Sequence, residues 1–203
     1  MILALLLAAA DPMPMSAVDA ERAFAADAQE LGYWTSFRKW AAPEAVMFML
    51  QPVRAADYLK DRGDPPNVAN WRTSLSFVSC DGSTAINTGV WTLTEGNQHG
   101  YFTTVWRRTG PDWRWELDSG DVLEEPRAAT KSPITRTAAC GSARPAHPIP
   151  PVAPDAKVGS GQSTDGTLIW SWSVRPNDDR RFVSRMWNGQ DWEVVVDDSK
   201  TGE

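Results

Sequence analysis

Hydrophobic and polar positions follow two different periods along this chain. In the first part, apolar residues recur at gaps of three and four, the period of an amphipathic helix. They are Ala17, Ala20, Phe24, Ala28, Leu31, Trp34, Phe37 and Ala41. Ser16 has the character of an N-cap, and Pro43 ends the run because proline disfavours helical geometry in the residue before it. The pattern predicts one long helix over about residues 17–41, bent near Gly32.

After residue 67 the period changes to two, which is typical of half-buried strands. A first strand is expected to place Trp71, Thr73, Leu75 and Phe77 on one face. Further strands are predicted over 84–94, 100–108 and 113–122, a short buried strand over 45–50 and a short helix over 54–62. The predicted fold class is α+β, with the long N-terminal helix packed on a curved antiparallel sheet.

The alternating pattern is written twice. Residues 101–121 read YFTTVWRRTGPDWRWELDSGD and residues 181–200 read RFVSRMWNGQDWEVVVDDSK. With gaps allowed, the matching pairs are Phe102 and Phe182, Trp106 and Trp187, Trp113 and Trp192, and Asp118 and Asp197. Each copy follows an Asp-Gly turn, at 81–82 and 165–166. Residues 161–203 are therefore predicted to form an appended β-meander that resembles residues 81–121. Such a ribbon is marginal alone, so it should extend the first sheet, pack on it or mediate a dimer.

The remaining segments divide the chain. Residues 1–10 are predicted to be a signal peptide, because an apolar run ends in small residues, although no Lys or Arg precedes it. This predicts an exported protein, periplasmic or secreted. Residues 16–125 are predicted to form the main domain and residues 126–160 a proline-rich linker, and residues 159–166 are expected to be a flexible approach to the second meander.

Export permits disulfides, and the chain has two cysteines. Cys80 lies at the end of a predicted strand and Cys140 lies in the linker. We expect them to form a bridge.

Charge removes some classes of partner. The net charge is −6 and no dense basic run occurs, so a nucleic-acid partner is not expected. The pairs Arg107-Arg108 and Arg180-Arg181 are interpreted as solvated strand residues. The apolar run at the start is nine residues long, against the roughly 20 that cross a bilayer, so no membrane span is predicted.

Residues 16–122 resemble the NTF2-like superfamily, which includes SnoaL-like, DUF4440-like and ketosteroid-isomerase-like proteins. The resemblance is carried by AERAFAADAQELGYWTSFRKW, by AVMFML and by the closing pair YFTTVWRR and DWRWELDSGD. It implies a cone whose open end forms a pocket for a small, mostly apolar molecule. Some members are isomerases, dehydratases or cyclases, and many are not catalytic. The proline-rich span and second meander depart from this pattern.

Eleven tryptophans are candidates for a ligand wall or for core packing. We expect Trp34, Trp71, Trp91 and Trp106 to wall a pocket between helix and sheet. Asp118 and Tyr33 are the catalytic candidates, because a desolvated carboxyl or phenol could move a proton. Against this, Asp197 stands at the equivalent place in the second copy, which favours a structural role for Asp118.

No metal site or cofactor is predicted, because His99 and His147 have no partner spacing and no nucleotide or hydrolase motif occurs. Three hypotheses remain: non-catalytic binding of a small apolar or aromatic molecule, an isomerase or dehydratase in the same pocket, and a module for homodimerisation or for interaction with an envelope partner.

Overall fold

The computed structural model describes residues 15–141, 145–147 and 152–202. The predicted signal peptide lies outside these residues. The helices are α1 (Ala17–Leu31), α2 (Tyr33–Trp40) and α3 (Ala55–Leu59), with a 3-10 turn η1 (Glu95–Asn97). The strands are β1 (Ala41–Phe48), β2 (Pro52–Arg54), β3 (Asn70–Val78), β4 (Thr84–Leu93), β5 (Gln98–Thr109), β6 (Asp112–Val122), β7 (Ile134–Thr137), β8 (Lys157–Gln162), β9 (Leu168–Val174), β10 (Arg180–Trp187) and β11 (Trp192–Lys200). Within the described residues, no helix is long and apolar enough to cross a bilayer.

The strands form two sheets. The first has the order β2-β1-β6-β5-β4-β3-β7, and it is mixed because β1 runs parallel to β6 and β7 runs parallel to β3. The second is an antiparallel sheet of order β11-β10-β9-β8. The predicted fold class is therefore wrong: the described chain is mostly strand, its main sheet is not purely antiparallel, and its helices are short.

The predicted long helix is broken at Gly32. Gly32 has φ 108° and ψ 150°, so α1 ends at Leu31, whose side chain is 45% exposed. Asp64 explains the break. Its carboxylate accepts the backbone amide of Thr35 at 2.8 Å and the Thr35 hydroxyl at 2.6 Å, so it caps the start of α2. A Cβ on residue 32 would lie 2.4 Å from the Asp64 carboxyl carbon. Glycine is thus required where the chain turns from α1 into α2.

A β-bulge in β3 places the side chains at its two ends on opposite faces of the sheet, whereas the sequence pattern predicts one shared face. The register with β4 shifts between Thr73 and Leu75. Trp71 consequently packs with the helices, whereas Phe77 packs with the second sheet. The expectation that both share one face is wrong, because one extra residue reverses every side chain after it.

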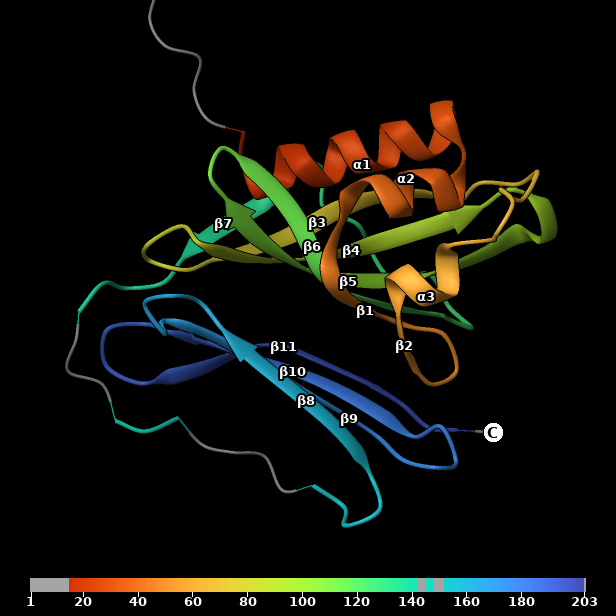
Figure 1. The fold of residues 1–203 in the computed structure, drawn as a ribbon. Helices are drawn as coiled ribbons and strands as arrows, with labels where there is room; N and C mark the ends of the chain where they lie inside the picture. Colours follow the sequence, from red (N-terminus) through yellow and green to blue (C-terminus); the bar gives the residue numbers. More distant parts are fainter. Residues whose placement is uncertain (1–14, 142–144, 148–151, 203) are drawn as a thin grey trace, which may run out of the picture.

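The molecule has three layers, with the helices on one face of the first sheet and the second sheet on the other (Figure 1). Phe24, Phe37, Trp40, Trp106 and Trp115 form the core on the helix side. Val105, Leu117, Leu168, Phe182 and Met186 form the core between the sheets. The second meander therefore packs on the first sheet as a separate sheet and buries its apolar face there.

The proline-rich span is tied to this sandwich. The expected Cys80–Cys140 disulfide is confirmed, with the two Cα atoms 5.2 Å apart. Just before it, β7 pairs with β3, and the amide of Ala138 donates to the carbonyl of Val78 at 2.8 Å. The expected flexible approach is also ordered in part, because β8 pairs with β9.

Candidate functional site

A cavity of about 680 Å³ lies between the helices and the first sheet. This volume is within the usual range for small-molecule sites. Aromatic side chains dominate its wall, among them Phe24, Tyr33, Trp34, Phe37, Tyr58, Trp71, Trp91 and Phe102. Met47, Phe48 and Met49 of β1 and the turn after it complete the apolar surface. The chamber suits an apolar or aromatic molecule.

Three of the four predicted tryptophans line this cavity. Trp34 comes from α2, Trp71 from β3 and Trp91 from β4. Trp71 and Trp91 are also direct cross-strand partners, so their rings belong to one stretch of wall. Trp106 does not line the cavity, because it is fully buried in the helix-side core.

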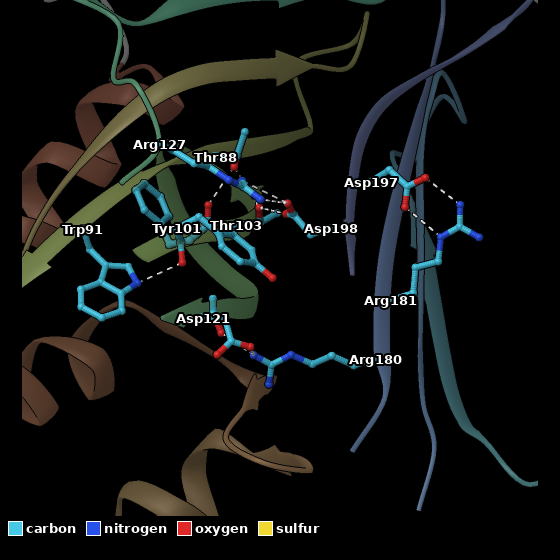
Figure 2. Close-up of polar contacts among 12 residues, drawn as sticks. Thr88, Trp91, Tyr101, Thr103, Asp121, Arg127, Arg180, Arg181, Asp197 and Asp198 are labelled. Carbon is cyan, nitrogen blue, oxygen red and sulfur yellow. Dashed lines mark hydrogen bonds and ion pairs between the residues drawn. The ribbon is translucent and has the colours of Figure 1, made fainter. Parts of the chain in front are cut away.

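Trp91 is held by a glycine and by a hydrogen bond. Its cross-strand partner on β5 is Gly100, where a Cβ would lie 2.4 Å from the indole ring. The indole Nε1 donates to the carbonyl of Tyr101 at 3.0 Å, as Figure 2 shows. A side chain at position 100 would displace the ring, so the glycine fixes this part of the wall.

Behind the wall lies a carboxyl group that the sequence analysis did not single out, that of Glu21. Its side chain is buried, and its oxygens accept the indole N–H of Trp106 at 2.6 Å, that of Trp71 at 2.9 Å and the amide of Asn87 at 3.2 Å. Burial raises the pKa of Glu21 to about 7, and these three donors oppose the rise. Glu21 thus anchors Trp71 from behind.

Asp118 is the carboxyl group that faces the cavity. It is on β6, where Leu117 points to the second sheet and Asp118 to the opposite side. Its hydrogen bond comes from the hydroxyl of Thr104, at 3.1 Å. Burial raises the pKa of Asp118 to about 8; the charge of Glu21 adds to the rise, and the Thr104 hydrogen bond opposes it. A side chain of this kind is protonated for the most part at neutral pH.

Tyr33, the second catalytic candidate, lines the same cavity at the start of α2. Burial, followed by the nearby charge of Asp118, raises the pKa of Tyr33 above its ordinary value. The phenol therefore keeps its proton and can donate a hydrogen bond to a ligand. The fold places Tyr33 and Asp118 close enough to interact electrostatically.

The rim of the cavity is charged. Asp121 of β6 receives Arg180 of β10 and Lys200 of β11, the latter with its Nζ 3.0 Å from Oδ1. Figure 2 shows Arg180 extending from the second sheet to Asp121. The interpretation of Arg180 as a solvated residue is wrong, because its side chain is 9% exposed.

The repeat does not give Asp118 and Asp197 the same environment. Asp197 forms an ion pair with Arg181 at 2.6 Å on the outer side of the second sheet, and both side chains are substantially exposed (Figure 2). Asp118 faces the cavity and forms no ion pair with a cation in the described part of the chain. The shared position in the repeat therefore does not assign the two carboxyl groups one role.

Among the residues that the structure describes, no group of three or more His, Cys, Asp or Glu side chains is placed to hold a metal ion. The polar groups on the cavity wall are the carboxyl groups of Asp118 and Asp121, both on β6, together with hydroxyl, amide, guanidinium and amine groups. Such an arrangement favours the orientation of an organic molecule.

No family model matches the sequence, and no curated protein matches it. Solved structures do match. One is a protein described as an aromatic ring hydroxylase from Novosphingobium aromaticivorans, with 15% identity and a TM-score of 0.36 over 55% of this chain and 89% of that chain. Another is the CamKII hub homology domain of Chlamydamonas reinhardtii, with 16% identity and a TM-score of 0.41 over 54% of this chain and 100% of that chain.

A third match is a protein described as a ketosteroid isomerase from Kribbella flavida, with 15% identity and a TM-score of 0.35 over 57% of this chain and 87% of that chain. Each of the three matches covers little more than half of this chain. Matches of this identity and TM-score say nothing about activity.

Proposed function

We propose that this protein is an exported NTF2-like protein that binds a small apolar or aromatic molecule between its helices and its first sheet. The observation that carries the proposal is the cavity of about 680 Å³, walled by aromatic rings from all three α-helices and from β1, β3, β4 and β5. Open aromatic surface of this extent is costly in water, so a ligand of matching size would be stabilised by burying it. The disulfide fits an oxidising compartment.

Titration with 1-N-phenylnaphthylamine, an uncharged dye whose emission rises in apolar surroundings, tests this proposal. We expect saturable binding at one site, with a change in tryptophan emission because Trp71 and Trp91 line the cavity. Ala69→Trp should weaken dye binding, because Ala69 lines the same cavity and the indole ring would occupy part of the space open to the dye.

Ala26→Trp is the matched control. Ala26 lies on the exposed side of α1, so the same ring added there should leave dye binding unchanged. Equal binding by the wild type and Ala69→Trp would place the dye elsewhere and contradict the proposal.

A second candidate, proton transfer at Asp118, is favoured by one specific observation. Asp118 faces the cavity with a pKa raised to about 8, so it can hold a proton at neutral pH and accept one when ionised. Tyr33 could donate a hydrogen bond to a ligand carbonyl. In such a step, the Asp118 carboxylate takes a proton from the carbon next to the carbonyl, leaves an enolate, and returns the proton to carbon.

Exchange of the α-protons of 2-tetralone in heavy water, followed by proton NMR, tests this candidate. The wild type should accelerate exchange with a rate that rises towards pH 8, and Asp118→Asn should lose at least about tenfold of that rate. Binding of the uncharged dye by a wild type that does not accelerate exchange would reject catalysis of this step and retain the binding proposal.

A further inference from the structure

We propose that the ligand of this cavity is an amphipathic acid, with an apolar or aromatic body inside the cavity and one anionic group held at the rim by Lys200 and Arg180. This inference rests on the proposed small-molecule binding and adds the charge of the ligand. The argument comes from where the two cations lie and how they are neutralised.

Both cations come from the second sheet, although the cavity is formed by the helices and the first sheet. Arg180 begins β10, Lys200 ends β11, and the two residues are direct cross-strand partners. Both line the cavity. The appended meander therefore adds charge to a chamber whose wall is otherwise mainly apolar.

Like charges on directly opposite strand residues repel each other. Asp121 lies between these two and pairs with both, so one ionised carboxylate serves two cations. The other partners of Arg180 are the neutral carbonyl groups of Met49 and Gly120. Asp118 is the other carboxyl group on the cavity wall, and its raised pKa keeps it largely uncharged near neutral pH. The rim consequently carries a net positive charge.

Hydrogen-bonding capacity remains at the same place. The Nε of Arg180 is buried and has no hydrogen-bond partner among the residues that the structure describes, and the Arg180 side chain as a whole is more than nine-tenths buried. The Nζ of Lys200 has three donors, one of which is used by Asp121, and its side chain is 35% exposed. A buried cation with unused donors favours an anion, because a charge-assisted hydrogen bond is stronger than a neutral one.

The rest of the cavity fits the apolar part of such a ligand. The ring of Phe48 lies 6.0 Å from the Arg180 guanidinium, and Phe48 and Trp71 both line the cavity. A molecule with its acidic group at the rim would direct its body along this wall. Cations at one end and aromatic rings at the other thus define one orientation.

A matched pair of dyes tests the inference. 8-Anilino-1-naphthalenesulfonate and 1-N-phenylnaphthylamine share one aromatic body, and the sulfonate is the difference between them. We expect the wild type to bind the sulfonate dye more tightly than the neutral dye. Added salt should weaken binding of the sulfonate dye and leave binding of the neutral dye unchanged. Lys200→Gln should lower the affinity for the sulfonate dye about tenfold and change the affinity for the neutral dye less than twofold.

Two variants serve as controls. Lys200→Arg should retain sulfonate binding, because it keeps the charge. Lys131→Gln removes an exposed lysine that does not line the cavity, and it should change neither dye. Neutral-dye binding together with unchanged sulfonate affinity in Lys200→Gln would overturn the inference and leave the proposed function standing. A wild type that binds neither dye would overturn both.

Discussion

Asp81 and Asp165 each accept the backbone amide of the other. The amide of Asp81 lies 3.0 Å from Oδ2 of Asp165, and the amide of Asp165 lies 2.9 Å from Oδ2 of Asp81. The two residues occupy the same position in the two Asp-Gly turns, and each also receives a hydroxyl two residues before it, from Ser79 and from Ser163. The two copies of the meander therefore meet through a reciprocal contact between equivalent turns.

Asp165→Asn should weaken this contact. The Asp165 carboxylate accepts from Asp81, Ser163 and Thr167, and an amide NH₂ in its place would set a donor against these donors. We expect the free energy of unfolding to fall by about 1–3 kcal/mol at pH 7, measured by urea denaturation. Asp155→Asn, which loosens only an exposed ion pair with Arg175, should cost much less.

The same variant has a predictable pH dependence. Burial would raise the pKa of Asp165, but hydrogen bonds from Ser163 and Thr167 outweigh burial and hold it below its ordinary value of 3.8. A lowered pKa means that the carboxylate stabilises the fold above that value and loses this contribution as the pH falls below it. The gap between wild type and Asp165→Asn should therefore narrow on acidification below pH 4. A difference in unfolding free energy that stays constant from pH 7 to pH 3 would contradict this pH dependence.

Loss of the Cys80–Cys140 disulfide should destabilise the protein strongly. The bridge joins residues 60 apart, which corresponds to about 4 kcal/mol of unfolding free energy in the chain-entropy account. Cys80→Ala, Cys140→Ala and the double variant should cost nearly the same, because each removes the one bond. Urea denaturation with and without reductant checks this, and reductant should have no effect on the double variant.

Stability should fall as the pH rises from about 5 to about 8. Glu21 and Asp118 have pKa values raised to about 7 and about 8 in the folded protein, so the folded state binds protons that the unfolded state has already lost. Each group lowers the free energy of unfolding by up to about 1.4 kcal/mol per pH unit within its window. Asp118→Asn should reduce this slope, measured by urea denaturation at several pH values.

Asp197→Asn is the matched control, because Asp197 holds the same place in the second copy. Its hydrogen bond to Arg181 lowers the pKa of Asp197, so its titration lies below the window tested. The slope between pH 5 and pH 8 should remain that of the wild type. An Asp118→Asn variant with an unchanged slope would show that Asp118 is ionised throughout this range.

Gly100→Ala should disturb the cavity wall. A Cβ there would lie 2.0 Å from the carbonyl oxygen of Asp121 and 2.4 Å from the Trp91 indole. We expect a loss of about 1–3 kcal/mol in unfolding free energy and weaker binding of 1-N-phenylnaphthylamine, because Trp91 must move. Gly63→Ala meets no atom within 4 Å and should change neither quantity. Unchanged dye affinity in Gly100→Ala would separate Trp91 from the binding site.

Local signals in the sequence were sufficient for much of the fold. The Ser16 cap and the buried positions Ala20, Phe24 and Ala28 predicted the first helix. The Asp-Gly turn at 81–82 predicted the strands on either side of it, and the turn at 165–166 predicted only the strand after it. The sequence pattern predicts a bend near Gly32, whereas the structure has two separate helices there. The residue that caps the second helix, Asp64, is distant in sequence and gives no local signal. The parallel strands and the bulge in β3 depend in the same way on long-range pairing.

The site was predicted in part. Tyr33, Asp118 and three tryptophans reach one cavity, but Trp106 faces a buried carboxylate that was not considered. A signal for that carboxylate existed, because Glu21 lies four residues after Ala17 and three before Phe24, on the apolar side of the helix. Arg180 gave no such signal, since its burial results from the packing of one sheet on another.

Leu117 and Asp118 are consecutive residues of β6 that point to opposite layers. A single peptide unit thus separates the hydrophobic core between the two sheets from the cavity under the helices. A displaced second sheet would withdraw Arg180 and Lys200 and also shift the strand that bears Asp118. A ligand that contacts both layers would hold them together. Ligand binding in the cavity should therefore stabilise the packing of the second sheet on the first, and that packing should in turn strengthen ligand binding.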